Sequence, residues 1–399
     1  MRDVAIVGGG PGGLHVASLL ARRGFDVSVY EEHPSSGAPV HCTGVLAADA
    51  FDEFALARDA VLNSLTTVRF HSPSGRSVAY TSERIEAVAV DRLCFDQQLQ
   101  TAASASGAAI VVGRRVDDVR VDRDGVTLEL RNGERARFRT VVLACGANYR
   151  LQRRLGLGLP SSHLQSAQAE VPTATPGDVE VHFGRQVAPG GFAWVVPVRR
   201  PGGWHARVGL MCERDSAVHF DRFLSNVASR WGLALDQTPP PRQKLLPLAP
   251  IGRTFADRML TIGDAGGIVK ATTGGGIYYS LLTASLAAAT LITALKADTL
   301  SAAALSHYER AWQRRLGGEM RAQQRLRAIA HRLTDEDMDA FFELAHTDGV
   351  MPILRRTARF NRHRDAIVAL LRHPPARRVL LRGLRHAPVR GRSHATHGA

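Results

Sequence analysis

The N-terminal stretch constrains the fold more than any other feature of the chain. Residues 3–32 read DVAIVGGGPGGLHVASLLARRGFDVSVYEE, an apolar strand, a glycine turn, an apolar helix and a second strand. Gly8, Gly10 and Gly13 fit the spacing G-x-G-x-x-G, and Glu31 ends the second strand. The glycines let a helix N-terminus approach a pyrophosphate, and the carboxylate can accept hydrogen bonds from a ribose. We therefore predict a βαβ unit of a doubly wound sheet that binds a dinucleotide.

Composition narrows the setting of this unit. With 399 residues, 45% of them hydrophobic, the chain can bury a sizeable core and is too long for one simple domain. Its four cysteines, Cys42, Cys94, Cys145 and Cys212, have neither metal-ligand nor disulfide spacing, so we predict no metal site and a reducing compartment. The N-terminus lacks the pattern of a signal peptide, which favours a cytoplasmic location. Residues 271–295 carry no charge and could span a bilayer, but glycines and hydroxyl residues interrupt them and favour a buried domain helix.

A second glycine-acid pair appears much later in the chain. Gly263 and Asp264 end an apolar strand in RMLTIGDAGGIVKATTGGGI. This stretch resembles the Gly-Asp motif of flavoproteins in the para-hydroxybenzoate hydroxylase superfamily, which implies that Asp264 binds the ribityl chain of FAD. Arg92, at the start of a predicted helix, resembles the superfamily's arginine near the flavin phosphates; a surface arginine is the alternative. The resemblance implies FAD as the bound cofactor.

The glycine run that follows suits a flat ring. Thr272 to Gly276 would lay bare backbone N–H groups against the isoalloxazine, where side chains would keep the ring away. A helix starting near Ile277 would aim its positive end, roughly half a unit charge, at the ring and favour the anionic reduced flavin. The cofactor-binding residues implied are Gly8, Gly10, Gly13, Glu31, Arg92, Gly263, Asp264, Thr273, Gly274, Gly275, Gly276 and Ile277.

The periodicity of the chain predicts an α/β fold: a Rossmann-like FAD-binding domain interleaved with an antiparallel β-sheet substrate domain, plus a C-terminal helical region. Strand patterns around Asp-Gly and Asn-Gly turns indicate an antiparallel meander before residue 145, and residues 161–242 read as strands. The predicted segments are 1–160 for the FAD-binding domain with substrate-domain strands inserted at about 50–90, 161–245 for the substrate domain, 246–300 for the return to the FAD-binding domain, 301–372 for C-terminal helices and 373–399 for a basic tail.

A narrower resemblance is carried by three stretches, GIVKATTGGGIYYSLL, PVHCTGVLA and GGFAWVVPVRRPGGWHARVGLM. They are similar to stretches of the geranylgeranyl reductase family, and with the glycine motifs the resemblance runs from residue 1 to about 339. It implies hydride transfer from reduced flavin to carbon-carbon double bonds of a prenyl or similarly apolar substrate. Phe192, Trp194, Val196 and Pro197 would form the substrate site. Cys42 would be a proton or redox participant, or a small residue that fits beside the ring, and His41 is a weaker acid candidate.

Three departures from the family pattern matter. Cys145 stands before Gly146 where the superfamily has Asp-Gly, which weakens the expectation that NADPH is the direct reductant, so NAD(P)H and ferredoxin both stay open. Phe192 and Val196 replace the signature's tyrosine and second aromatic residue, so no phenol is available there for proton transfer. Ala271 replaces a proline of the glycine stretch.

Charge is concentrated at the C-terminus. Residues 355–392 contain twelve arginines and one acid, which accounts for +11 of the net +14. No nucleic-acid motif accompanies them, so we expect no nucleic-acid partner. Apolar clusters alternating with arginine suit the anionic inner face of a membrane or a phosphorylated ligand, and a solvated basic tail is the alternative. Arg199 and Arg200 are further candidates for the head group of a prenyl diphosphate or lipid.

Other activities remain open at this point. An FAD-dependent aromatic hydroxylase or monooxygenase would share the fold, but Cys145 and the long match through Thr-Thr-Gly-Gly-Gly-Ile-Tyr-Tyr speak against it. A flavin halogenase is a lesser alternative, because none of the few lysines falls in a stretch that resembles a halogenase site. An electron-transfer flavoprotein would suit the basic C-terminus, yet four scattered cysteines make no cluster motif.

Overall fold

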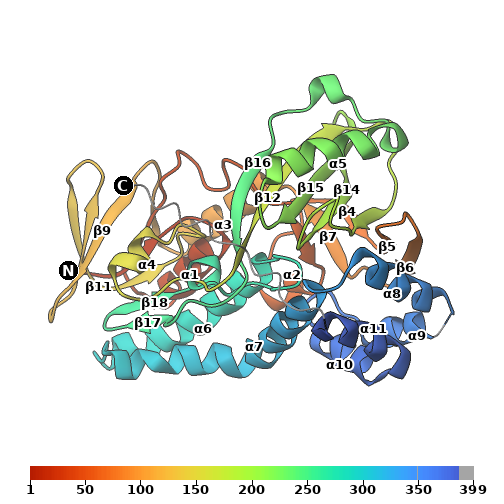
Figure 1. Cartoon of the computed structure of the whole chain (residues 1–399). Helices are drawn as coiled ribbons and strands as arrows, with labels where there is room; N and C mark the ends of the chain where they lie inside the picture. Colours follow the sequence, from red (N-terminus) through yellow and green to blue (C-terminus); the bar gives the residue numbers. More distant parts are fainter. Residues whose placement is uncertain (348, 386–399) are drawn as a thin grey trace, which may run out of the picture.

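The computed structural model describes residues 1–347 and 349–385, and it has the predicted α/β architecture (Figure 1). The first sheet has the order β17-β18-β11-β1-β2-β8, with the hairpin β9-β10 joined to β11. Strands β18, β11, β1, β2 and β8 are parallel, and the hairpin is antiparallel, as the meander predicted. The bounds are β1 Arg2–Val7, β2 Val27–Tyr30, β8 Ala109–Val111, β9 Val116–Val121, β10 Val126–Leu130, β11 Arg135–Leu143, β17 Phe255–Ala256 and β18 Met259–Thr261.

Helices cover one face of this sheet. They are α1 Pro11–Ala21, α3 Arg92–Ala105, α6 Ile277–Lys296 and α7 Ala302–Ala330. Val4 and Ile6 of β1 face these helices, while Ala5 and Val7 face the meander, so the central strand is buried on both sides. Helix α6 is long and apolar enough to cross a bilayer, but it packs within this core, as predicted for a domain helix.

The second sheet joins strands from two distant parts of the chain. Its order is β16-β12-β15-β14-β13-β5-β6, and all neighbours are antiparallel except β13 and β5. The bounds are β5 Thr67–His71, β6 Ser77–Thr81, β12 His163–Pro172, β13 Val179–His182, β14 Phe192–Arg200, β15 Gly203–Cys212 and β16 Arg242–Pro247. A small third sheet holds β3 Val45–Ala47, β7 Ala87–Val90 and β4 Val61–Leu65. The short helices are α2 Ala50–Glu53 and α4 Arg150–Arg154, with 3-10 turns at Leu235–Gln237 and Gly263–Gly266.

One helix lies where only strands were predicted. Helix α5, Ser216–Trp231, packs across one face of the second sheet (Figure 1). Its buried residues Phe220, Phe223, Leu224, Val227 and Trp231 follow a helical period, which is the signal that the strand prediction for 161–242 missed.

The C-terminal helices form a cluster beside β5 and β6 (Figure 1). They are α8 Asp335–Thr347, α9 Val350–Thr357, α10 Arg364–Arg372 and α11 Pro374–Arg385. Helix α8 contacts β6, and α11 contacts α7, α8 and α10. The predicted tail therefore begins with a helix that packs on the rest of the cluster, and residues 386–399 of that prediction lie outside the described part of the chain.

Candidate active site

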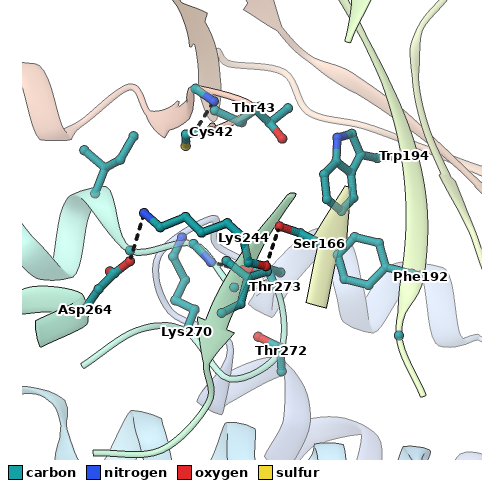
Figure 2. Close-up of a pocket in the computed structure, with 18 of the residues that line it drawn as sticks. Cys42, Thr43, Ser166, Phe192, Trp194, Lys244, Asp264, Lys270, Thr272 and Thr273 are labelled. Carbon is teal, nitrogen blue, oxygen red and sulfur yellow. Dashed lines mark hydrogen bonds and ion pairs between the residues drawn. The ribbon is translucent and has the colours of Figure 1, made fainter. Parts of the chain in front are cut away.

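One cavity of about 1060 Å³ connects both sheets with the C-terminal helices. The glycine turn at residues 8–12, residues 37–45 and the turn at 272–277 line one end. The other end is lined by the second sheet and by apolar side chains of α8, α9 and α10. Figure 2 shows the middle of this cavity, where Cys42, Lys244 and Thr273 lie between Asp264 and Trp194.

The N-terminal turn fits a nucleotide. Gly8 has φ +110°, and a Cβ at Gly13 would collide with the Gly8 carbonyl, so both positions require glycine. A Cβ at Gly10 would meet nothing within 4 Å, which leaves the start of α1 open to the cavity. Helix α1 has no side-chain cap and begins with Pro11, so its first N–H groups are available to an anion.

Glu31 is held at the edge of this turn. Its Oε2 accepts a hydrogen bond from Gly9 N at 2.7 Å, and its Oε1 accepts one from His33 N at 3.0 Å. The carboxylate lines the cavity with an orientation set by two backbone groups, as a ribose partner requires.

The second motif meets the glycine run directly. The Asp264 carboxylate lies against Gly276. A Cβ on Gly276 would collide with this carboxylate. Lys244 Nζ is 4.0 Å from Asp264 Oδ2 and reaches across the cavity from β16 (Figure 2). Thr273, Gly274, Gly275, Gly276 and Ile277 all line the cavity, so the turn and Asp264 form one surface.

The turn differs from the prediction in one respect. Gly274 N donates to Lys270 O at 2.8 Å, and Gly275 N donates to Thr273 Oγ1 at 3.4 Å. These two N–H groups have acceptors within the turn, so they are not the free donors that the prediction assumed. Helix α6 begins at Ile277 without a side-chain cap, so its positive end still faces the cavity.

Arg92 and Cys42 lie together at the opposite side of the cavity. The Arg92 guanidinium forms a buried ion pair with Asp96 at 2.8 Å, and the Cys42 thiol contacts Arg92. Cys42 Sγ accepts a hydrogen bond from Gly44 N at 3.3 Å. Arg92 lines the cavity as predicted for a phosphate contact, but its charge is already paired with Asp96.

The apolar end presents the predicted aromatic residues. Phe192, Trp194 and Val196 alternate along β14 and face the cavity, with the two aromatic rings edge to face at 5.8 Å. The Trp194 ring lies over Gly209, where a Cβ would come within 2.6 Å of Cζ2. Pro197 does not line the cavity, and its carbonyl accepts a hydrogen bond from Asn63 Nδ2.

Two residues that line the cavity each have a buried polar atom without a partner among the described residues. Trp194 Nε1 and His41 Nδ1 have no hydrogen bond to any residue that the structure describes. Both atoms are covered by the protein itself, so a ligand in the cavity would not reach them in this structure. Burial, followed by the nearby charge of Lys244, lowers the pKa of His41, so His41 is neutral at pH 7.

Arg199 and Arg200, which we expected near the substrate head group, contact other protein side chains instead. Arg200 pairs with Glu170 at 2.7 Å and with Asp91, and the Arg199 guanidinium stacks on Trp204 at 5.7 Å. Neither residue lines the cavity, so the prediction that they receive the substrate head is wrong for this structure.

The departures from the family pattern have physical reasons. Ala271 N donates to Gln323 Oε1 at 2.9 Å, a bond that a proline could not make. Burial raises the pKa of Cys145 to about 11, so this residue supplies a neutral thiol where the superfamily has a carboxylate.

Sequence reasoning missed two features of the site. Lys270 is 3% exposed and lines the cavity below the glycine turn, although it stands within the stretch that carried the resemblance. His363 also lines the cavity, and its Nδ1 shares a hydrogen bond with Thr272 Oγ1 at 2.7 Å. Only the fold brings α10 to this turn, so no local pattern pointed to His363.

A cluster of potential metal ligands lies on the α5 face of the second sheet. His71, Glu180 and His182 come together there, but the two imidazoles stack with their planes 3° apart and their centroids at 4.2 Å. Ring nitrogens in parallel, offset planes cannot both point their lone pairs at one ion. Arg230 Nη2 lies 2.5 Å from Glu180, so the carboxylate is neutralised within the protein.

Known proteins with similar sequences and structures include flavoproteins and prenyl-lipid reductases. Residues 2–169 match the pyridine nucleotide-disulphide oxidoreductase family. The digeranylgeranylglycerophospholipid reductase of Methanocaldococcus jannaschii is 29% identical over 86% of this chain and 90% of its own length. A second reductase of that name, from Methanothermobacter thermautotrophicus, is 26% identical over 85% and 90%.

A solved structure extends the match to nearly the whole fold. The geranylgeranyl bacteriochlorophyll reductase-like protein of Thermoplasma acidophilum superposes with a TM-score of 0.82 at 22% identity, covering 96% of this chain and 98% of that one. The chain is therefore similar to these reductases over most of its length, and the likenesses indicate an FAD-dependent oxidoreductase.

The halogenase PltM has the same fold as this chain, with a TM-score of 0.67 at 15% identity over 96% of this chain and 86% of its own. A likeness at that identity shows a common architecture and carries no activity across. Another PltM structure contains FAD.

Proposed function

We propose that this oxidoreductase reduces carbon-carbon double bonds of a prenyl or similarly apolar substrate. The observation that carries the proposal is the continuity of the cavity. It runs without interruption from the glycine turn, where we expect the flavin, to an apolar end between β14 and the C-terminal helices. Its volume of about 1060 Å³ has to hold the cofactor as well as the substrate.

The apolar end is built from two sides. Phe192, Trp194 and Val196 contribute from the sheet, and α8 to α10 contribute apolar side chains from the opposite side. The lining residues of the helices are Met338, Phe341, Phe342, Ala345, Val350, Met351, Leu354, Ala366, Ile367 and Leu370. Such a surface gains free energy by covering an isoprenoid chain and offers little to a small polar substrate.

FAD, when bound and reduced, supplies the hydride for such a reaction. The protein must then exclude water from the alkene, hold it beside the glycine turn and deliver a proton to the far carbon. Cys42 is the candidate that we assign to proton delivery, because its thiol lines the cavity opposite the turn and is oriented by Gly44 N. Trp194 and Phe192 would position the apolar chain of the substrate.

The external reductant is NAD(P)H or a ferredoxin in this proposal. Cys145 in place of the superfamily's aspartate leaves no carboxylate there for a nicotinamide nucleotide, which supports a protein donor.

We also propose that the protein works in the cytoplasm at the inner face of a membrane. Helices α9, α10 and α11 carry exposed arginines, and residues 349–385 contain a single acid, Asp365. The same helices line the apolar end of the cavity, so contact with an anionic bilayer would bring a lipid substrate to it. Flotation with vesicles of neutral or anionic lipid tests this: binding only to anionic vesicles, weakened by salt and by Arg377→Gln/Arg378→Gln, is expected. Equal binding to both lipids would overturn it.

The experiment for the activity is anaerobic. Protein loaded with FAD is reduced with dithionite, and geranylgeranyl diphosphate or a prenylated glycerophospholipid is added. Reoxidation of the flavin without oxygen is the expected result. Flavin that stays reduced until air is admitted, with both substrates, would contradict alkene reduction and favour an oxygen-using activity.

A further inference from the structure

Lys270 occupies an unusual place for a lysine. It is 3% exposed and lines the cavity, with its side chain packed against the glycine turn. A Cβ built on Gly275 would lie 3.2 Å from Lys270 Cε and 3.6 Å from Nζ. The amine therefore lies against the turn on which the flavin ring is predicted to lie, and Figure 2 shows Lys270 beside Thr272 and Thr273 of that turn.

The hydrogen-bond partners of this amine are neutral. Nζ donates to Phe360 O at 3.0 Å and to Asn361 Oδ1 at 3.1 Å, and it lies 4.2 Å from the centroid of the Phe360 ring. No carboxylate of the described residues lies within ion-pair distance of it. A buried ammonium without a counterion is unfavourable. A negatively charged ligand in the cavity would supply the counterion that the protein does not.

The charged groups around Lys270 come from three elements. Asp49, before α2, reaches Lys270 through Asn361, whose Nδ2 donates to Asp49 Oδ1 at 3.1 Å. Glu319 on α7 contributes a second, more distant negative charge, but its Oε1 is bound by His363 N and Arg364 N. His363, before α10, is neutral at pH 7 because burial, and then the charge of Lys270, lowers its pKa to about 4. Burial outweighs the two acids and lowers the pKa of Lys270 to about 7.

We propose that Lys270 is the electrostatic partner of the reduced flavin. Two electrons and one proton, delivered by dithionite and water or by the natural donor, leave the ring with one negative charge. Lys270 then takes one proton from solvent, so its ammonium neutralises that charge, and it releases the proton when the ring is oxidised. In this role Lys270 acts only through its charge and forms no bond with the substrate.

The chain offers a matched control because it contains only three lysines, Lys244, Lys270 and Lys296. Lys296 is an exposed residue at the end of α6. The test is the midpoint potential of bound FAD against pH in Lys270→Met, Lys270→Arg and Lys296→Met.

Wild type and Lys296→Met should take up two protons per two electrons above about pH 7, so the potential should fall twice as steeply with pH as in Lys270→Met. Lys270→Met should also have a lower potential at pH 7. Lys270→Arg should lose the extra slope but keep a higher potential than Lys270→Met, because its charge is permanent. Equal slopes in wild type and Lys270→Met would overturn the proposal.

A measurement on the unaltered protein covers the case in which a variant does not fold or bind FAD. Lysine labelled with ¹³C at Cε gives three signals, and the Lys270 signal should titrate at higher pH with reduced than with oxidised FAD. An unchanged midpoint would refute the proposal. Both experiments need bound FAD and use no alkene. A negative result in them would therefore not contradict the proposed alkene reduction. A negative alkene assay would not contradict the role of Lys270, which these two experiments test separately.

Discussion

The Thr272 hydroxyl and the Nδ1 atom of His363 lie 2.7 Å apart and share a hydrogen bond. Thr272 belongs to the glycine turn at one end of the cavity, and His363 immediately precedes α10, which lines the apolar end. His363 N also donates to Glu319 on α7, with Oε1 as acceptor. The relationship joins the two ends of the cavity through one side chain.

This contact should make the protein sensitive to acid. Burial, and then the charge of Lys270, lowers the pKa of His363 to about 4, below the ordinary 6.5. Between these values the unfolded chain binds more protons, so the free energy of unfolding falls as pH falls from 6.5 toward 4, by about 2 kcal/mol at pH 5. Urea unfolding at pH 7 and pH 5 should show this loss in wild type and a smaller loss in His363→Gln. The exposed His307→Gln is the control, and an equal loss in His363→Gln and wild type would count against the assignment.

The nucleotide turn can be tested without disturbing the protein around it. A Cβ at Gly10 meets no atom within 4 Å, so Gly10→Ala should keep the melting temperature of the FAD-free protein. The added methyl would occupy the space of the pyrophosphate, and the Kd for FAD should rise at least about tenfold, or about 1.4 kcal/mol. Gly202→Ala, where a Cβ also meets nothing, should leave the Kd unchanged. Fluorescence titration with FAD measures both, and unaltered affinity in Gly10→Ala would exclude this turn as the site.

Cys42 should matter for chemistry and not for cofactor binding. Cys42→Ser is expected to slow substrate-driven flavin reoxidation by about 100-fold, the effect of removing a general acid. FAD affinity should not change. The matched variant is Cys94→Ser, because Cys94 does not line the cavity. Rates in Cys42→Ser equal to wild type would remove the thiol from the mechanism.

Trp194 should determine how well an apolar chain is held. Trp194→Ala removes the ring that lies over Gly209 and beside Phe192, and the loss of apolar contact should cost about 1–2 kcal/mol, so KM should rise roughly 5- to 30-fold. The Kd for FAD should stay the same. Trp194→Phe keeps a ring and should fall between wild type and Trp194→Ala. A KM unaffected by Trp194→Ala would mean that the substrate lies elsewhere in the cavity.

The sequence predicted the parts of the fold that depend on local chemistry. Gly8, Gly13 and Gly276 each occupy a position where a side chain would collide with the backbone or with Asp264, so glycine at fixed spacing was a readable signal. The βαβ unit, the meander and α6 followed from periodicity in the same way.

What could not be predicted depends on contacts between distant segments. Residues 373–385 were predicted as part of a basic tail, because charge dominates that stretch, yet they include helix α11, whose Leu380 lines the cavity. Arg200 looked available for a head group until the fold placed Glu170 and Asp91 beside it. Helix α5 could have been predicted, because its apolar residues follow a helical period in the sequence.

The mass of the product tests the central claim most directly. The FAD-loaded protein, reduced anaerobically, should convert a prenyl substrate into products that gain the mass of two hydrogen atoms for each double bond lost. In deuterated water two deuterium atoms should appear on each reduced bond, because the hydrogen carried by dithionite-reduced flavin and the delivered proton both come from the solvent. A product that instead gains an oxygen atom on admission of air, or a prenyl substrate recovered unchanged, would contradict the account.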